Sequence, residues 1–332
     1  MATLSVKNPN LLDLAKVMDP NGTIADVVEI LNETQEILED MSWMEGNLPT
    51  GNRTSIRAGI PDPTWRKLYG GVQPTKGRSL QVTDSCGMLE AYAEVDKALA
   101  DLSGNASSFR LLEDRAHIEG IAQELADTLF FGNETTEPEA FTGLAPRFNS
   151  TTAANGENVI LGGGSGSDNT SIWLIVWGPR TVHGIIPKGS KAGMQVRDLG
   201  EVTVENADGA SGRMQAYRTH YRFDAGLTVR DWRYIVRIPN IDKSDLTKNA
   251  SAGADLIDLL TRAIEMIPSL NAGRACFYGS RTIRSFLRRQ IANKVVNSTL
   301  TMDSVAGKPV MAFDGIPFKR CDALAADEAL VS

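Results

Sequence analysis

Residues able to act as acids, bases or nucleophiles are sparse in this 332-residue chain. Its three histidines, His117, His183 and His220, fall in a predicted helix and in predicted strands. A general base must lie beside a reacting group, and the sequence contains no Gly-x-Ser-x-Gly elbow with acid and histidine partners. A structural role therefore fits each histidine better, and the sequence nominates no catalytic residue.

The cysteines do not form a metal or redox motif. Cys86, Cys276 and Cys321 lie far apart, without a Cys-x-x-Cys or Cys/His spacing. Such spacing brings thiolates together around zinc, and disulfide frameworks are typical of small secreted domains. We therefore expect three free thiols in a reducing compartment, with no bound metal ion and no cofactor.

One glycine-rich run has the composition of a phosphate-binding loop. Residues 162–167 read Gly-Gly-Gly-Ser-Gly-Ser. A phosphate loop must open a helix whose N-terminus holds the anion, but the next apolar run, residues 172–177, has the character of a strand. No Gly-Lys-Ser/Thr follows either, so the run predicts a flexible turn and no nucleotide site.

The composition is that of a soluble globular protein, with 42% hydrophobic and 23% charged residues. The run at residues 172–177 is the longest apolar one, and it is far shorter than the roughly 20 residues that span a bilayer. No basic segment followed by an apolar core opens the chain, so we expect a protein that is neither secreted nor membrane-spanning. A net charge of -7 opposes tight, sequence-independent binding to nucleic acid.

Residues 1–45 predict an N-terminal arm that contains one acidic amphipathic helix. Thr23 and Asp26 can cap the start of this helix, which is expected to end near Ser42. Its apolar residues recur at helical spacing and its glutamates lie opposite them. Such a helix packs on its own domain or lies as an arm on a neighbouring molecule.

Residues 46–87 are so rich in glycine and proline that they predict a long two-stranded excursion without a core of its own. A loop of this length that contains Trp65, Leu68, Tyr69 and Val72 is expected to bury those side chains somewhere. Two hypotheses stay open. The excursion lies over another molecule, or its residues fold back as a lid on a binding cleft.

A long helix is predicted for residues 107–131, roughly 36 Å long at about 1.5 Å per residue. It follows a short helix or strand-to-helix transition at residues 88–102, and Ser107 or Ser108 is expected to cap it. Its acidic side chains are expected to face solvent. The apolar stripe expected to face the core consists of Leu111, Ile118, Ile121, Leu125 and Leu129.

The remaining chain predicts a sheet followed by a compact α/β unit, so the fold class is α+β. After residue 240 the pattern changes to a helix that ends at Pro268, a strand, a helix capped by Ser280 and two more strands. Antiparallel strands are expected before that point at residues 172–177, 182–186, 202–205, 215–223 and 227–238, and the later strands are expected at 274–278, 310–313 and 316–319.

Two stretches carry a resemblance to a known family. The first, from Phe130 to Phe148, joins a Phe-Phe-Gly-Asn helix end to a Thr-Gly-Leu elbow. The second, from Phe313 to Leu324, contains Gly-Ile-Pro and then Asp-Ala-Leu. Together with the excursion and the long helix, they resemble the Hong Kong 97-like major capsid proteins of tailed double-stranded DNA bacteriophages, most closely that of a short-tailed Bordetella phage.

This resemblance implies a Hong Kong 97-like capsid fold with four parts. In the family, strands like those of residues 214–240 come last in the chain, whereas here they precede the axial unit, so we expect reordered connectivity. The four parts are an N-terminal arm and helix at residues 1–45, an extended loop at 46–87, a peripheral domain at 88–240 with β-strands and a spine helix at 107–131, and an axial α/β domain at 241–332.

The resemblance also implies a structural function and no enzymatic activity. Such subunits assemble as pentamers and hexamers into an icosahedral virion capsid, which encloses double-stranded DNA without reading its sequence. Assembly would take place in the host bacterial cytoplasm, with a scaffolding protein, a portal and a cement or decoration protein as further partners. Two alternatives stay open: an encapsulin-like cellular compartment shell, and a cytosolic α/β enzyme with residues 46–80 as its lid.

The resemblance implies two sets of contacts between subunits. The axial set consists of Arg281, Arg284 and Arg288. It forms a basic helix face, with Arg289 and Lys294 nearby, that fits packaged DNA, acids of a neighbouring subunit or bulk solvent. Some relatives crosslink through a loop lysine, but the sequence places no partner for one here and no crosslink is predicted. The loop set consists of Arg57, Trp65, Arg66, Lys67, Tyr69 and Lys76.

Overall fold

The computed structural model describes residues 35–102, 104–205, 212–247, 253–293, 300–305, 308–324 and 327–332. Within these ranges the chain forms two compact units. Unit 1 is made of residues 88–125 and 191–224, and unit 2 of residues 35–87, 126–190 and 225–332. Three long elements contribute residues to both units: β3 (Arg78–Asp96), α4 (Ala106–Phe131) and β7 (Arg213–Val229).

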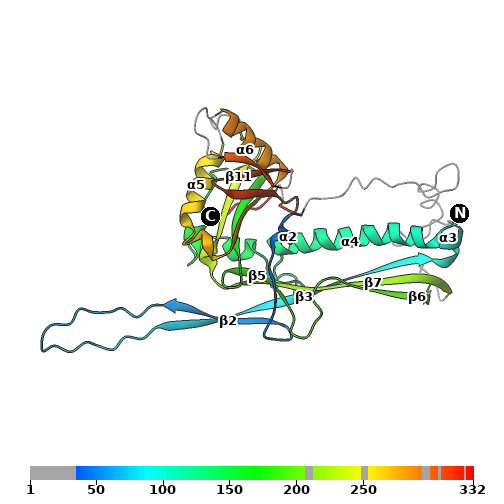
Figure 1. Ribbon diagram of the computed structural model, residues 1–332, viewed down its shortest axis with the longest axis horizontal. Helices are drawn as coiled ribbons and strands as arrows, with labels where there is room; N and C mark the ends of the chain where they lie inside the picture. Colours follow the sequence, from blue (N-terminus) through cyan, green and yellow to red (C-terminus); the bar gives the residue numbers. More distant parts are fainter. Residues whose placement is uncertain are drawn as a thin grey trace. The chain divides into compact units, whose positions relative to one another are not determined.

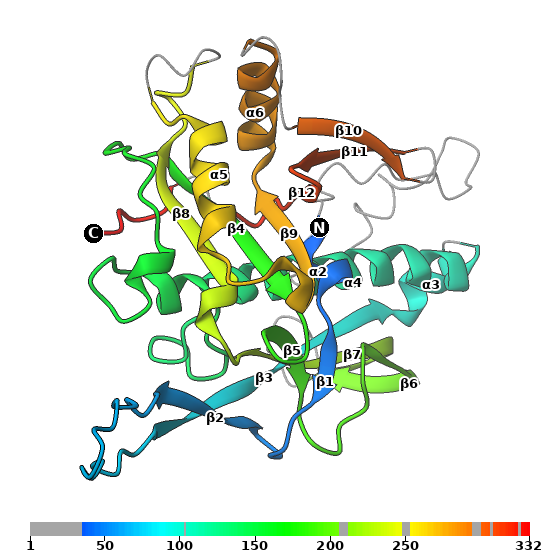
Figure 2. The same ribbon diagram turned by 60° about the vertical axis from the view of Figure 1, so that its left-hand side comes forward.

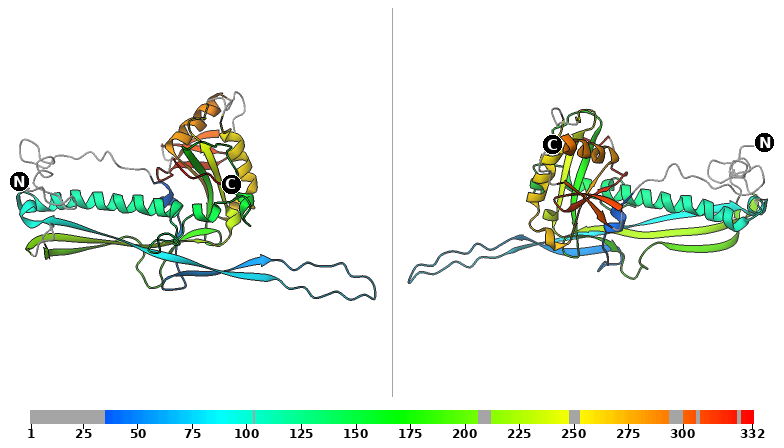
Figure 3. Two further views of the ribbon diagram at one scale, coloured as in Figure 1. Left: turned by 180° about the vertical axis from the view of Figure 1, so that it is seen from behind. Right: turned by 45° about the horizontal axis from the view of Figure 1, so that its top comes forward.

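Unit 1 packs α4 against a sheet formed by β3, β6 and β7 (Figure 3). Strand β6 (Gln195–Glu205) pairs antiparallel with β7, and β7 pairs with β3. After β3 the short helix α3 (Lys97–Leu102) leads into α4, so the predicted strand-to-helix transition is confirmed. Phe109 and Ile121 of α4 and Tyr221 of β7 are buried and form the core of this unit.

The long helix predicted at residues 107–131 is confirmed as α4, but two details of that prediction are wrong. Leu111 and Ile118 are 62% and 38% exposed, because the helix turns Phe109 and Ile121 toward the sheet instead. The cap is Asn105 rather than a serine. Its side-chain oxygen accepts a hydrogen bond from the Ser108 amide at 3.2 Å, and its carbonyl accepts one from the Phe109 amide.

We predict that Asn105→Ala destabilises the subunit by about 1 kcal/mol, because an amide of the first turn loses its acceptor. Urea unfolding of the isolated subunit measures this free energy. Ser107→Ala is the matched control, and it should change the free energy of unfolding by less than about 0.5 kcal/mol. A larger effect for Ser107→Ala than for Asn105→Ala would show that the cap is misassigned.

The main sheet of unit 2 is mixed and runs in the order β10, β11, β12, β9, β4, β5. Strand β9 is antiparallel to β4 and parallel to β12, while β8 pairs antiparallel with β4 and β1 pairs parallel with β5. The strands are β1 (Trp43–Glu45), β4 (Asn169–Trp177), β5 (Val182–Ile186), β8 (Ile235–Asp242), β9 (Arg274–Gly279), β10 (Leu300–Val305), β11 (Lys308–Phe313) and β12 (Ile316–Arg320).

Helices α5 (Leu256–Met266) and α6 (Arg281–Asn293) lie on one face of the strands β8, β4 and β9 (Figure 2). Asp255 caps α5, and Ser280 caps α6 as the sequence predicts. Leu174 of β4 faces this helical layer, whereas the neighbouring Trp173 packs with Phe130 and Phe148 on the other face. Each such fully buried side chain stabilises the fold by about 1.5–3 kcal/mol.

Most predicted strands are present, and the sheet departs from the prediction in three ways. The strand predicted at residues 227–238 is interrupted, because Asp231 caps a short 3-10 turn at Trp232–Tyr234 that ends β7 and redirects the chain into β8. The sheet is not wholly antiparallel, and β10 has no counterpart among the predictions. The boundary expected at residue 240 falls inside β8.

The helix predicted to end near Ser42 falls mostly on residues 1–34, outside the described part of the chain. In the described part, α2 (Ile37–Asp40) ends two residues earlier than predicted, and β1 begins at Trp43. Three other 3-10 turns complete unit 2, at Ala145–Phe148, Gly156–Asn158 and Leu270–Ala272. The glycine run is confirmed as non-helical. The amides of Gly162 and Gly164 donate to the carbonyls of Pro239 and Asn240 in β8.

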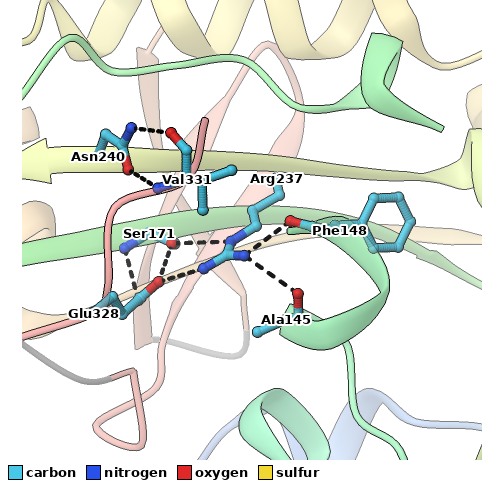
Figure 4. A network of polar contacts seen from close by, with 7 residues as sticks. All are labelled: Ala145, Phe148, Ser171, Arg237, Asn240, Glu328 and Val331. Carbon is cyan, nitrogen blue, oxygen red and sulfur yellow. Dashed lines mark hydrogen bonds and ion pairs between the residues drawn. The ribbon is translucent and has the colours of Figure 1, made fainter. Parts of the chain in front are cut away.

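A buried ion pair fastens residues 327–332 to the sheet (Figure 4). The Arg237 guanidinium contacts Glu328 at 2.7 Å and donates to the Phe148 carbonyl at 2.8 Å. Glu328 also accepts from the hydroxyl and the amide of Ser171. Three residues on in each segment, the Asn240 side chain brackets the backbone of Val331, donating at 2.7 Å and accepting at 2.9 Å.

We predict that Glu328→Gln lowers the free energy of unfolding by about 3 kcal/mol, because it leaves the buried Arg237 charge uncompensated. Thermal unfolding checks the effect. In an Arg237→Met background the same substitution should cost at least about 1 kcal/mol less, since the charge to be compensated is gone. Equal costs in the two backgrounds would show that the pair does not act as a unit.

Candidate assembly surface

Unit 2 carries a long hairpin whose tip has no partner within the described chain. Strands β2 (Gly51–Gly59) and β3 pair antiparallel from Gly51 opposite Ser85 onward, and residues 60–77 join them (Figure 1). Trp65 and Tyr69 are fully exposed, and Leu68 is nearly so. The expectation that this loop buries its apolar side chains is therefore not met inside one chain.

The tip is a defined turn rather than an unstructured bend. The Gly70 amide donates to the Lys67 carbonyl at 3.1 Å, and the Arg66 side chain donates to the Gly70 carbonyl at 2.9 Å. Tyr69 has a positive φ of 65°. This conformation costs a bulky residue energy and persists only where the surrounding structure imposes it. Lys67 lies in the same turn, so an aromatic and basic group is displayed together at the tip.

The other loop residues singled out by the sequence lie on the same hairpin. Arg57 is in β2 opposite Ser79 of β3, next to a shift of register between Arg57 and Gly59. Lys76 is exposed, beyond the end of the ladder. The whole loop set of candidate contacts therefore lies on this one hairpin.

The base of the hairpin is held by groups that sequence reasoning did not single out. The buried carboxylate of Asp84 in β3 contacts the Arg147 guanidinium at 2.7 Å. Arg147 also donates to the carbonyls of Gly143 and Thr142, so it ties the Thr-Gly-Leu elbow to β3. Asn52 of β2 donates to the Thr228 hydroxyl at 3.4 Å.

The elbow itself closes the end of α4. The Gly132 amide donates to the Thr128 carbonyl, and the Gly143 amide then donates to the Gly132 carbonyl. A Cβ on Gly143 would lie 2.5 Å from the Thr128 carbonyl oxygen, so glycine is required there. This explains the Phe-Phe-Gly and Thr-Gly-Leu pattern as a helix end and not as a ligand site.

The axial set of arginines lies on α6. Arg281 and Arg288 are exposed, and Arg284 is half-buried. Burial lowers the pKa of Arg284 from its usual range, and the nearby charges of Arg288 and Arg320 act in the same direction, while Glu36 opposes them. Arg289 lies over the Phe286 ring at 4.9 Å, and Lys294 lies outside the described residues.

Comparison with known proteins identifies what kind of molecule carries these surfaces. The model of a family described as Major capsid protein GP7 matches residues 19–332. The chain belongs to this major capsid protein family. It is therefore a shell-forming subunit of a tailed bacteriophage. A comparison with curated proteins found no match.

One solved structure with substantial sequence identity agrees with this assignment. The capsid protein is similar to a chain in the structure of bacteriophage Epsilon15, with 40% sequence identity, 100% of this chain and 99% of that chain covered, and a TM-score of 0.78. The capsid of bacteriophage JBD30 matches at 8% identity, covering 89% of this chain and 93% of that chain, with a TM-score of 0.48. An encapsulin complex of Synechococcus elongatus matches at 10% identity, covering 70% and 95%, with a TM-score of 0.40.

The histidines of the capsid protein make structural contacts. His117 stacks on Tyr221 with ring centroids 6.3 Å apart, and His220 stacks on Tyr92 at 4.5 Å and lies 3.2 Å from Glu90. None of the three cysteines forms a disulfide bond. Among the described residues, no group of three or more His, Cys, Asp or Glu side chains could hold a metal ion, and no helix is long and apolar enough to cross a membrane.

His183 gives the subunit a predicted pH dependence. Burial, with help from the charge of Arg230, lowers the pKa of this histidine from 6.5 to about 4. The unfolded chain therefore binds a proton more readily, and the stabilising effect is complete above about pH 6.5 and is lost as the pH falls toward 4. We expect the loss to approach about 3 kcal/mol.

Chemical unfolding of the isolated subunit between pH 7 and pH 4 measures this dependence. His183→Gln should flatten the curve in that window, whereas His220→Gln, which removes a more exposed histidine, should keep its slope. An unchanged slope in His183→Gln would show that another group sets the acid sensitivity.

Proposed function

We propose that this capsid protein assembles as pentamers and hexamers into an icosahedral phage head that encloses double-stranded DNA. The observation that carries the proposal is the fully exposed aromatic tip of the β2–β3 hairpin. An isolated subunit has no reason to display Trp65 and Tyr69 to water, since exposed apolar patches mark surfaces that another protein covers. The partner that a shell always supplies is a second copy of the same chain.

The loop set and the axial set act as contacts between copies in this proposal. The loop set, Arg57, Trp65, Arg66, Lys67, Tyr69 and Lys76, docks on a neighbour through its aromatic side chains, with the cations at the rim. The axial set, Arg281, Arg284 and Arg288, meets acids of a neighbouring subunit. Many such contacts of modest affinity add up to a stable shell without trapping misassembled forms.

The proposal assigns family roles to the parts of the chain. α4 is the spine helix of a peripheral domain, residues 46–87 are the extended loop, and residues 1–45 provide the N-terminal arm. The axial domain contains β9 and β12, and their parallel pairing in one sheet supports a Hong Kong 97-like arrangement with reordered connectivity. The boundaries of the four parts belong to the same proposal, at residues 1–45, 46–87, 88–240 and 241–332.

Further partners belong to the same proposal. A scaffolding protein, a portal and a cement or decoration protein would join the shell during assembly in the host bacterial cytoplasm. DNA is enclosed without sequence-specific contacts, in keeping with the net charge of -7. Particular closeness to a Bordetella phage stays a prediction, and no catalytic residue or cofactor forms part of the function.

The two alternatives lack a specific observation in their favour. A lid of a cytosolic enzyme would cover a cleft of its own chain, but Trp65, Leu68 and Tyr69 make no such closure and stay exposed. An encapsulin-like compartment has the same kind of subunit and differs in its contents. The nucleic acid content of purified particles separates it from a phage head.

We predict that Trp65→Ser combined with Tyr69→Ser lowers the yield of assembled particles by at least about tenfold, because the variant loses the apolar anchors of the contact. The free energy of unfolding of the isolated subunit should change by less than about 0.5 kcal/mol, since neither side chain is buried there. Sedimentation and electron microscopy measure the particles, and urea unfolding measures the subunit.

Met266→Ser combined with Leu330→Ser serves as the matched control, because both side chains are partly exposed apolar groups of unit 2 outside the hairpin. This pair should leave the particle yield close to that of the wild type. Normal particles from the hairpin variant would refute the role of the tip. A monodisperse wild-type monomer or dimer at every concentration would refute the shell itself.

A further inference from the structure

The 16 residues that precede β2 form a brace across one end of the unit 2 sheet. At one end the Glu36 amide donates to the Arg320 carbonyl of β12, and at the other end β1 pairs parallel with β5, with Trp43 opposite Gly184 (Figure 2). We define the brace as residues 35–50. It ends directly before Gly51, the first residue of β2.

The middle of the brace is fixed by one carboxylate, that of Asp40. Its side chain is completely buried and receives three donors. Lys319 of β12 lies at 2.7 Å, the Arg274 guanidinium of β9 at 2.8 Å, and the Tyr278 hydroxyl of β9 at 2.8 Å. The Tyr278 oxygen in turn accepts from the Trp177 indole of β4 at 2.8 Å. One acid on a four-residue helix thus contacts β12 and β9 directly and reaches β4 through Tyr278.

Without the brace, Lys319 and Arg274 would lose the carboxylate that they share. Asp40 carries one negative charge against the positive charges of Lys319 and Arg274, and the Lys319 side chain is 14% exposed. If the brace left the sheet, Lys319 would lose its ion pair with Asp40, and the Tyr278 hydroxyl would lose its acceptor. Breaking a buried pair in this way is strongly destabilising, so the brace is held in one position.

Past Asp40, the brace sets the base of the hairpin through several short contacts. The Gly46 amide donates to the Ile186 carbonyl at 2.8 Å, and the Lys188 amide donates to the Leu48 carbonyl at 3.2 Å. Gly46 lies so close to Gly51 that a Cβ on it would be 2.5 Å from the Gly51 carbonyl oxygen. A shift of the brace therefore moves the first residue of β2.

We propose that Asp40 is a positioning residue for assembly, which fixes the base of the exposed hairpin through the brace. The inference rests on the proposed shell function. It goes further in naming a single buried carboxylate, outside the hairpin tip, that sets where the hairpin begins. Loss of Asp40 then impairs assembly through misplacement and leaves the contact residues themselves unchanged.

The test compares Asp40→Asn with Glu328→Gln as a matched control. Both substitutions replace one carboxylate oxygen by an amide in a buried ion pair of unit 2, at 2.7 Å from its cation in each case. Hydrogen exchange of the full-length subunit locates the segment that each variant releases. Sedimentation and electron microscopy then measure particle yield and form.

We expect Asp40→Asn to raise amide exchange in residues 35–50 by about 100-fold and to extend the increase to the base of β2, with particle yield reduced by about tenfold. Glu328→Gln should raise exchange around residues 327–332 and leave residues 35–50 protected. Arg274→Gln is a milder second variant, because that side chain is 59% exposed, and it should raise exchange in residues 35–50 by about fivefold.

Two results would overturn the proposal. Wild-type protection of residues 35–50 in both Asp40→Asn and Arg274→Gln would show that Asp40 does not fix the brace. Released residues 35–50 with normal particles would show that the brace does not position the hairpin for assembly. If the wild type itself formed no particles, the shell function would fail, and the exchange data would still decide whether Asp40 fixes the brace.

Discussion

Strand β4 is buried along its whole length, and this constraint organises the rest of unit 2. A strand with both faces covered needs packing on each side and partners at each edge, because no polar group of its backbone can turn to water. Leu174 meets the helical layer on one face, and Trp173 meets Phe130 and Phe148 on the other. Strands β8 and β9 complete the edges, so segments distant in the sequence converge on this one element.

Polar anchors then fix segments that hydrophobic packing alone would leave sliding. Arg237 with Glu328, Arg147 with Asp84 and Lys319 with Asp40 each pair a buried or nearly buried acid with a cation from another element. Such pairs add little net stability over apolar side chains of the same size, but mispairing them is costly. Their value is therefore in selecting one arrangement of the hairpin base, the brace and residues 327–332.

The sequence predicts this fold where a single local pattern decides the outcome, as for β5, whose bounds match the predicted strand at residues 182–186. It fails where a side chain overrides the pattern. Asp231 breaks a continuous apolar run, and Asn105 caps α4 in place of the nearby serines. Among the site residues, glycine and proline content reveals the hairpin. The pairing of Asp84 with Arg147 joins residues 63 apart in the chain, and no local signal marks it.

The hairpin ladder ends where its register shifts between Arg57 and Gly59, opposite Arg78. Beyond that point the two connecting segments are not tied to each other by strand pairing, so their curvature can change without breaking a ladder bond. The proposed assembly into both pentamers and hexamers requires neighbouring subunits to meet at more than one angle. The hairpin can change its angle with the smallest loss of hydrogen bonds next to this shift of register. That position lies between the paired β2–β3 ladder and the hydrogen-bonded turn at the tip.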